Sequence, residues 1–111
     1  MKMTMEELNS ACMEMIASAG EGRAIVFEAL DEINAENYAM ADKKLTQAQE
    51  FLAEAHRIQF EKLMAPQNNG VEIPFSMLLL HAMDMSMVAT SEHDLLRSIV
   101  NARLSRKEEN V

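Results

Sequence analysis

Residues 74–89 read PFSMLLLHAMDMSMVA, and nearly every position from Phe75 onward is apolar. Proline suits the first turn of a helix, where an N–H would have no partner within the helix. A helix that is apolar almost all round has no face that favours solvent. We therefore expect a long helix over about residues 74–104 that packs against protein on more than one side.

A first helix is expected over about residues 4–34. Thr4 and Glu7 have the spacing of a capping box, and apolar residues follow them at helical intervals. Gly20 and Gly22 fall inside this pattern and lower its helix propensity. The sequence therefore predicts one helix with a weak or bent middle or, as the alternative, a break at Gly20.

A second helix is expected over about residues 37–64. Its apolar residues alternate spacings of three and four, which is the pattern of a helix that packs along one seam. Pro66 is expected to stop this helix, and the pair Asn69 and Gly70 suits a turn with positive φ. The stretch from Pro66 to Gly70 is therefore the expected linker.

The three helices predict an all-α fold, an antiparallel three-helix bundle that forms a single domain over residues 1–111 with a frayed tail at 105–111. Only three glycines and two prolines interrupt the chain, which favours long helices. An isolated three-helix bundle leaves each helix one exposed stripe, and the third helix has no stripe polar enough to face solvent. We therefore expect the chain to self-associate.

Composition and charge exclude several classes of function. The formal net charge is −8, and acidic residues are concentrated in the first third of the chain, so nucleic-acid binding is not expected. No apolar run approaches the ~20 residues that span a bilayer, and the polar N-terminus lacks a signal sequence. We therefore expect a cytoplasmic protein without direct membrane insertion. Cys12 is the only cysteine, which excludes an internal disulfide and favours a buried, inert thiol.

Two residues, His81 and Asp84, break the apolar character of the third helix. Their separation of three places both on one helix face with Met77, Met85 and Val88. A buried, ionised aspartate would have to be protonated, paired or bound to a cation, and this helix offers no nearby lysine or arginine. If the third helix forms the seam between copies of the chain, the Asp84 residues would meet at a symmetry axis and could share a divalent ion or a proton.

His81 is the candidate nucleophile, because a neutral ring nitrogen can accept a phosphoryl group. A single histidine in an apolar helix can also be a hydrogen-bonded core residue. The other two histidines are expected at the surface, His56 beside Arg57 on the second helix and His93 beside Asp94 on the third. Antiparallel packing could bring His56 or Arg57 to the layer of His81, where either would offer a phosphate a positive neighbour.

Three segments resemble the lactose/cellobiose-class enzyme IIA components of the sugar phosphotransferase system. Residues 78–87, LLLHAMDMSM, resemble the family's LLVHAQDHLM signature, with His81 on its phosphorylated histidine and Asp84 on its metal-binding aspartate. Residues 18–30, SAGEGRAIVFEAL, are similar to the family's SG-x-AR…A-x-EAL stretch, and residues 53–59, AEAHRIQ, to its NEAH-x-IQ. The likeness covers nearly the whole chain.

The resemblance implies a homotrimer, a nine-helix assembly in which the three Asp84 residues hold one divalent metal ion, with Mg²⁺ as the expected ion. It also implies that His81 accepts a phosphoryl group from the histidine-containing phosphocarrier protein. His81 would pass this group to a cysteine of enzyme IIB of a β-disaccharide transporter of the lactose, cellobiose or chitobiose type. The protein would then be a phosphotransferase component without independent substrate turnover. The membrane component chooses the sugar in this family, so the sequence does not distinguish among these sugars.

The sequence departs from the family signature at Met83 and Met85, which replace a glutamine and a histidine. His81 and Asp84 are retained, but two polar groups that could bond to the phosphorylated residue or choose a partner are lost. This loss supports an alternative function, a non-catalytic helical interaction or regulatory protein on the same scaffold. A plain coiled-coil scaffold is disfavoured because it gives no reason to place Asp84 in the apolar helix.

Overall fold

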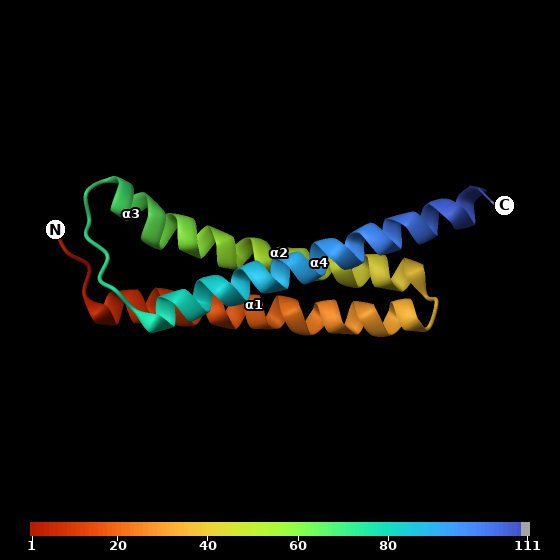
Figure 1. Cartoon of the computed structure of the whole chain (residues 1–111), viewed down its shortest axis with the longest axis horizontal. Coiled ribbons are helices and arrows are strands. Elements are labelled where there is room, and N and C mark those ends of the chain that lie inside the picture. The colour runs from red at the N-terminus through yellow and green to blue at the C-terminus, as the bar shows by residue number, and fades with distance from the viewer. Residues whose placement is uncertain (110–111) are drawn as a thin grey trace.

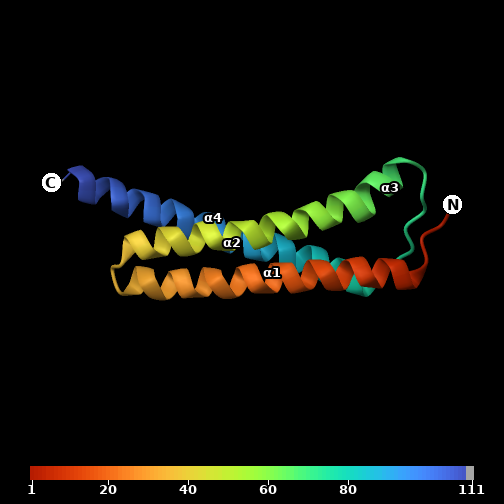
Figure 2. The same cartoon turned by 180° about the vertical axis from the view of Figure 1, so that it is seen from behind.

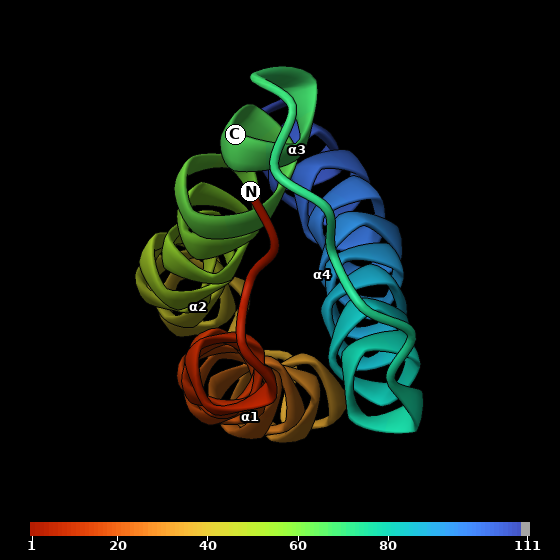
Figure 3. The same ribbon diagram turned by 90° about the vertical axis from the view of Figure 1, so that its left-hand side faces the viewer.

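The computed structural model describes residues 1–109, which form three long helices (Figure 1). The elements in chain order are α1 (Met5–Asn34), α2 (Tyr38–Gln59), a five-residue π-helical turn η1 (Phe60–Met64), the short helix α3 (Ala65–Asn68) and α4 (Met77–Glu109). α1 and α2 form an antiparallel hairpin, and α4 returns antiparallel to α2 and packs against both (Figures 1 and 3). The expected all-α, antiparallel three-helix bundle is confirmed, and its assembly into a trimer stays a prediction.

Helix α1 is one helix of 30 residues, as expected, and the alternative of a break at Gly20 is wrong. It starts as expected, because the Thr4 hydroxyl oxygen accepts a hydrogen bond from the Glu7 N–H at 3.1 Å. Gly22 is buried against α2, where an added Cβ atom would lie 2.8 Å from the Leu52 side chain and 3.2 Å from the Ala48 carbonyl oxygen. This glycine therefore permits the close approach of α1 and α2.

The helical path of α2 continues through η1 and α3 to Asn68, so the expectation that Pro66 stops the helix is wrong. Pro66 lies in the first turn of α3, and the wider hydrogen bonds of η1 precede it, such as that from Ala65 N to Phe60 O. This arrangement accommodates the missing N–H of proline. The chain turns at Gly70, whose φ of +93° is the left-handed conformation expected there.

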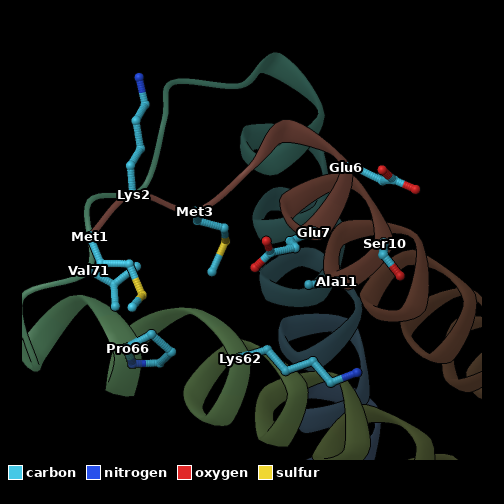
Figure 4. A pocket seen from close by; sticks show the side chains of 10 residues that line it. All are labelled: Met1, Lys2, Met3, Glu6, Glu7, Ser10, Ala11, Lys62, Pro66 and Val71. Carbon is cyan, nitrogen blue, oxygen red and sulfur yellow. The ribbon is translucent and has the colours of Figure 1, made fainter.

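The N-terminus pairs with the linker that precedes α4. Met3 N donates to Glu72 O and Glu72 N donates to Met1 O, both at 2.9 Å. A hollow of about 610 Å³ lies beside this pairing, with Lys62 of η1 and Val71 of the linker in its lining (Figure 4). The residues that line it come from this end of the bundle and do not include any from α4.

Helix α4 begins and ends later than expected. Pro74 lies outside the helix, and the Ser76 hydroxyl oxygen caps its start by accepting from the Leu79 N–H at 3.2 Å. At the other end the helix continues to Glu109, so residues 105–109 are helical where a frayed tail was expected. The last two residues of that tail lie outside the described residues. Basic side chains in the last turn favour this extension, since they offset the negative end of the helix dipole.

The core is built mainly from α1 and α2. Leu8 and Met15 of α1 and Leu45 of α2 are fully buried. Cys12 is buried with them, and burial raises the pKa of its thiol, as expected of an inert cysteine.

The buried residues of helix α4 are mostly small, and larger ones such as Leu79 and Leu96 pack partly against this core. The buried residues of α4, which we call the inward face, are Ala82, Ser86, Ala89, His93 and Val100. Short side chains let neighbouring helices approach closely. The large apolar residues of α4 that remain exposed, which we call the outward face, are Met77, Leu80, Met87, Val88, Leu95 and Ile99. The single chain therefore buries only part of the apolar surface of this helix.

Candidate functional site

His81 lies in the second turn of α4, and its side chain is exposed. Within residues 1–109 neither of its ring nitrogens has a hydrogen-bond partner, whereas the other two histidines are bonded. It lines a hollow of about 250 Å³, here called the His81 pocket, together with Asp84, Met85, Val88 and Arg23. His81, Asp84, Met85 and Val88 therefore share one face of α4, as predicted. An exposed neutral imidazole with both nitrogens open can act as a nucleophile.

Asp84 is exposed in the single chain, and it has no ion-pair partner among the residues that the structure describes. The single chain therefore does not bury this carboxylate, and its burial between copies of the chain stays a prediction. Burial of Asp84 would require a second surface to cover this face. Within the described residues no group of three or more His, Cys, Asp or Glu side chains could hold a metal ion.

Arg23 brings a positive charge to the His81 pocket from α1. Its Nε and Nη2 donate to the two carboxylate oxygens of Glu92 on α4, at 2.7 and 3.2 Å. The centre of its guanidinium group lies 5.1 Å from the centre of the Phe27 ring. The hydrogen bonds to Glu92, followed by the negative charge of that residue, raise the pKa of Arg23 above its ordinary value. The sequence pointed to His56 or Arg57 of the second helix as the positive neighbour of His81, and Arg23 was not foreseen in this role, although it lies in a segment that resembles the family.

His93 is buried, with 5% of its surface exposed, so the expectation of a surface position is wrong. Its Nε2 donates to the Leu45 carbonyl oxygen of α2 at 2.9 Å, and its Nδ1 lies 3.0 Å from Asp94 Oδ1. Both ring nitrogens therefore have protein partners, as is typical of a core histidine. The neighbouring Asp94 suggested a surface position, but His93 falls seven residues after Ser86 and so lies on the inward face.

Neither His56 nor Arg57 lines the His81 pocket of its own chain. His56 is exposed as expected, and its Nε2 lies 3.1 Å from Thr90 Oγ1, farther along α4. Arg57 forms ion pairs with two glutamates of its own helical segment. The positive neighbour expected from α2 is thus supplied by α1 instead, through Arg23.

The two methionines that replace polar residues of the family signature have different surroundings. Met85 lines the His81 pocket and makes part of its wall apolar. Met83 is partly buried and packs against the core at the N-terminal end of the bundle. The change at Met85 therefore affects the surroundings of His81, and the change at Met83 affects packing.

The outward face of α4 and the residues before it leave a large apolar surface on the single chain. Phe75 is 78% exposed and Met77 is 71% exposed. No helix within residues 1–109 has the length and apolar character needed to cross a membrane. Exposed apolar patches of this kind mark contacts with other proteins or with other copies of the same chain.

Comparisons with known proteins agree on one group. The family described as "PTS system, Lactose/Cellobiose specific IIA subunit" matches residues 10–103. The "PTS system lactose-specific EIIA component" of Staphylococcus aureus is 32% identical over 98 residues, which cover 88% of this chain and 94% of that protein. The protein of the same description from Lactococcus lactis subsp. lactis is 30% identical over 98 residues, which cover 88% of this chain and 92% of that protein.

Two solved structures share the fold. The crystal structure of PtcA from S. mutans has a TM-score of 0.87 and 32% identity, and the match covers 91% of this chain and 98% of that one. The PTS cellobiose-specific enzyme IIA from Bacillus anthracis has a TM-score of 0.81 and 27% identity, and the match covers 96% of this chain and 94% of that one.

Proposed function

The chain belongs to the lactose/cellobiose-specific IIA subunits of the sugar phosphotransferase system, and we propose that His81 is the residue on which it carries a phosphoryl group. Membership makes the protein a phosphocarrier component of sugar uptake. One observation supports the choice of His81 over the other histidines. Within the described residues it alone has both ring nitrogens open, and it lines a pocket at the surface.

In the proposed reaction a neutral ring nitrogen of His81 attacks the phosphorus of the phosphohistidine on the histidine-containing phosphocarrier protein. A new P–N bond forms as the donor's P–N bond breaks, and the donor's imidazole leaves with the electron pair. The phosphoryl group then passes to a cysteine thiolate of enzyme IIB of a β-disaccharide transporter, in the cytoplasm, with a P–S bond formed and the P–N bond of His81 broken. Phosphoryl transfer of this kind depends on alignment and electrostatics, and the exposed imidazole of His81 is accessible to both the donor and the acceptor protein.

The test of this function is transfer of label from radiolabelled phosphoenolpyruvate through the general phosphotransferase proteins. We expect label on the wild type, none on His81→Ala, and undiminished label on His56→Ala, whose histidine is also exposed and on another helix. Absence of label from the wild type, or label retained by His81→Ala, would refute the relay and favour the non-catalytic interaction or regulatory protein.

We also propose that three copies of the chain assemble with their outward faces against one another and their Asp84 carboxylates around one divalent cation, with Mg²⁺ as the expected ion. Two features support this arrangement. The apolar outward face of α4 is exposed, and the Asp84 carboxylate on the same part of the helix has no ion-pair partner within residues 1–109. Carboxylate oxygens are hard ligands of the kind that Mg²⁺ prefers. Bound there, the cation would supply the positive charge that three converging carboxylates require.

Native mass measurement with and without a chelator tests the assembly and the metal together. We expect a trimer with one bound divalent ion, and a less stable trimer after chelation. Asp84→Asn should still assemble and should lose the dependence on metal, because the amide removes the charge repulsion together with the ligand. If added metal still stabilised Asp84→Asn, the proposed metal site would be wrong.

A further inference from the structure

The His81 pocket has one cationic side chain in its lining, and it comes from a different helix than the histidine. From this juxtaposition we infer that Arg23 binds the phosphoryl oxygens while the group is carried on His81. The inference rests on the proposed function of His81 and adds to it a second residue that contacts the transferred group.

The charge of the phosphorylated state calls for a cation at this place. A phosphoryl group on a side chain carries about −1.5 to −2 charges at neutral pH. The chain as a whole has a net charge of −8. A phosphate entering this pocket therefore meets an unfavourable field, which the guanidinium group of Arg23 offsets locally.

The contacts of Arg23 hold its guanidinium group in place and leave part of it available. Glu92 accepts from Nε and Nη2, and the ring of Phe27 lies 5.1 Å away from the guanidinium carbon. Within residues 1–109 the remaining nitrogen, Nη1, has no hydrogen-bond partner. Arg23 can therefore donate to a phosphoryl oxygen without giving up its pair with Glu92, and Glu92 acts as a positioning residue.

Such a contact is worth most in the transition state. The transferring phosphoryl group is then loosely bound to both nitrogens, and its negative charge is spread over three oxygens. A fixed donor directed at those oxygens stabilises this charge without reorganisation at the moment of transfer. Removal of one such donor typically slows a reaction by about 100-fold or more in a water-excluded site, so about 10-fold or more is the expectation for this exposed pocket.

The competing interpretation of Arg23 is an ion pair that only joins α1 to α4. Another arginine provides a matched control, because Arg97 on α4 pairs with Asp42 on α2 and likewise joins two helices. Arg97 does not line the His81 pocket. If Arg23 is only structural, removal of either arginine should change the rate of phosphorylation of His81 to a similar extent. If Arg23 binds the phosphoryl group, only its removal should slow phosphorylation of His81.

The experiment measures the initial rate at which His81 is phosphorylated by radiolabelled phosphoenolpyruvate and the general phosphotransferase proteins, per folded chain. We expect Arg23→Ala to lower this rate by about 10-fold or more, Arg23→Lys to retain an intermediate rate, and Arg97→Ala to remain close to the wild type. Added methylguanidinium at millimolar concentration should restore part of the rate of Arg23→Ala and should leave that of Arg97→Ala unchanged.

The outcomes separate this inference from the proposed function. A wild type that takes no label on His81 would overturn both. A labelled wild type with an unchanged rate in Arg23→Ala, an equal loss in Arg97→Ala, or no response to methylguanidinium would overturn the role of Arg23 alone. Circular dichroism of each variant gives the folded fraction by which the rates are divided, and Arg23→Lys, which keeps the charge, provides a second folded test.

Discussion

Helix α4 carries one histidine on its inward face and one at its exposed surface beside the outward face, and the two residues have opposite surroundings. His93 on the inward side is buried and bonded at both ring nitrogens, by Leu45 and Asp94. His81 is exposed, and within the described residues both of its nitrogens are open. The same residue type thus serves packing at one position and is available for chemistry at the other. Occupation of the ring nitrogens separates the two roles.

The two faces also differ in the size of their side chains. The inward face is mostly alanine and serine, whereas the outward face carries leucine, methionine and other large apolar residues. An ordinary amphipathic helix places its large apolar residues toward the core. In α4 the small residues allow close contact with α1 and α2, and larger ones such as Leu79 and Leu96 pack partly against the core. The large residues of the outward face remain for a second surface, as the proposed trimer requires.

The largest expected difference between the faces concerns their histidines. His93→Ala should lower the free energy of unfolding by about 3 kcal/mol, because it leaves a cavity and removes the hydrogen bond between α4 and the Leu45 carbonyl oxygen. His81→Ala should change it by no more than about 0.5 kcal/mol, since its side chain is exposed and unbonded within residues 1–109. Urea unfolding at one fixed protein concentration measures both, and equal losses would erase the distinction between the faces.

A second prediction concerns the space available on each face. Ala89→Leu should lower the free energy of unfolding by about 2 kcal/mol, since the added atoms have no room between α4 and the core. Met87→Leu on the outward face keeps its volume and should change the same quantity by less than about 1 kcal/mol. The midpoint of urea unfolding, at constant slope, reports the difference. A neutral Ala89→Leu would show that the inward face is loosely packed.

The smallest expected effect concerns Ser86 on the inward face. Its Oγ is buried and has no hydrogen-bond partner among the residues that the structure describes. Ser86→Ala should raise the free energy of unfolding by about 1 kcal/mol, because it removes an unsatisfied polar atom from the core. Ser91→Ala on an exposed position gives the gain from helix propensity alone, roughly 0.5 kcal/mol. A loss of stability in Ser86→Ala would mean that the hydroxyl has a partner after all.

Local sequence signals predicted the elements better than their ends. Helical periodicity is repeated over many residues, so the three long helices could be recognised from it. The end of a helix depends on only one or two residues. Pro66 was expected to stop a helix that in fact continues through it. Pro74 was expected to begin a helix that in fact starts after it and is capped by Ser76. The chemistry of proline permits both outcomes, and the neighbouring backbone hydrogen bonds decide between them.

The sequence alone determined that His81 and Asp84 share one face, because residues three apart on a helix are neighbours whatever surrounds it. Only the tertiary structure decided that His93 turns inward to Leu45, and that Arg23 reaches the His81 pocket from another helix. Contacts between helices depend on where their axes cross and on the rotation of each about its axis. These quantities result from the packing of the whole bundle, and the spacing of residues along one helix does not contain them.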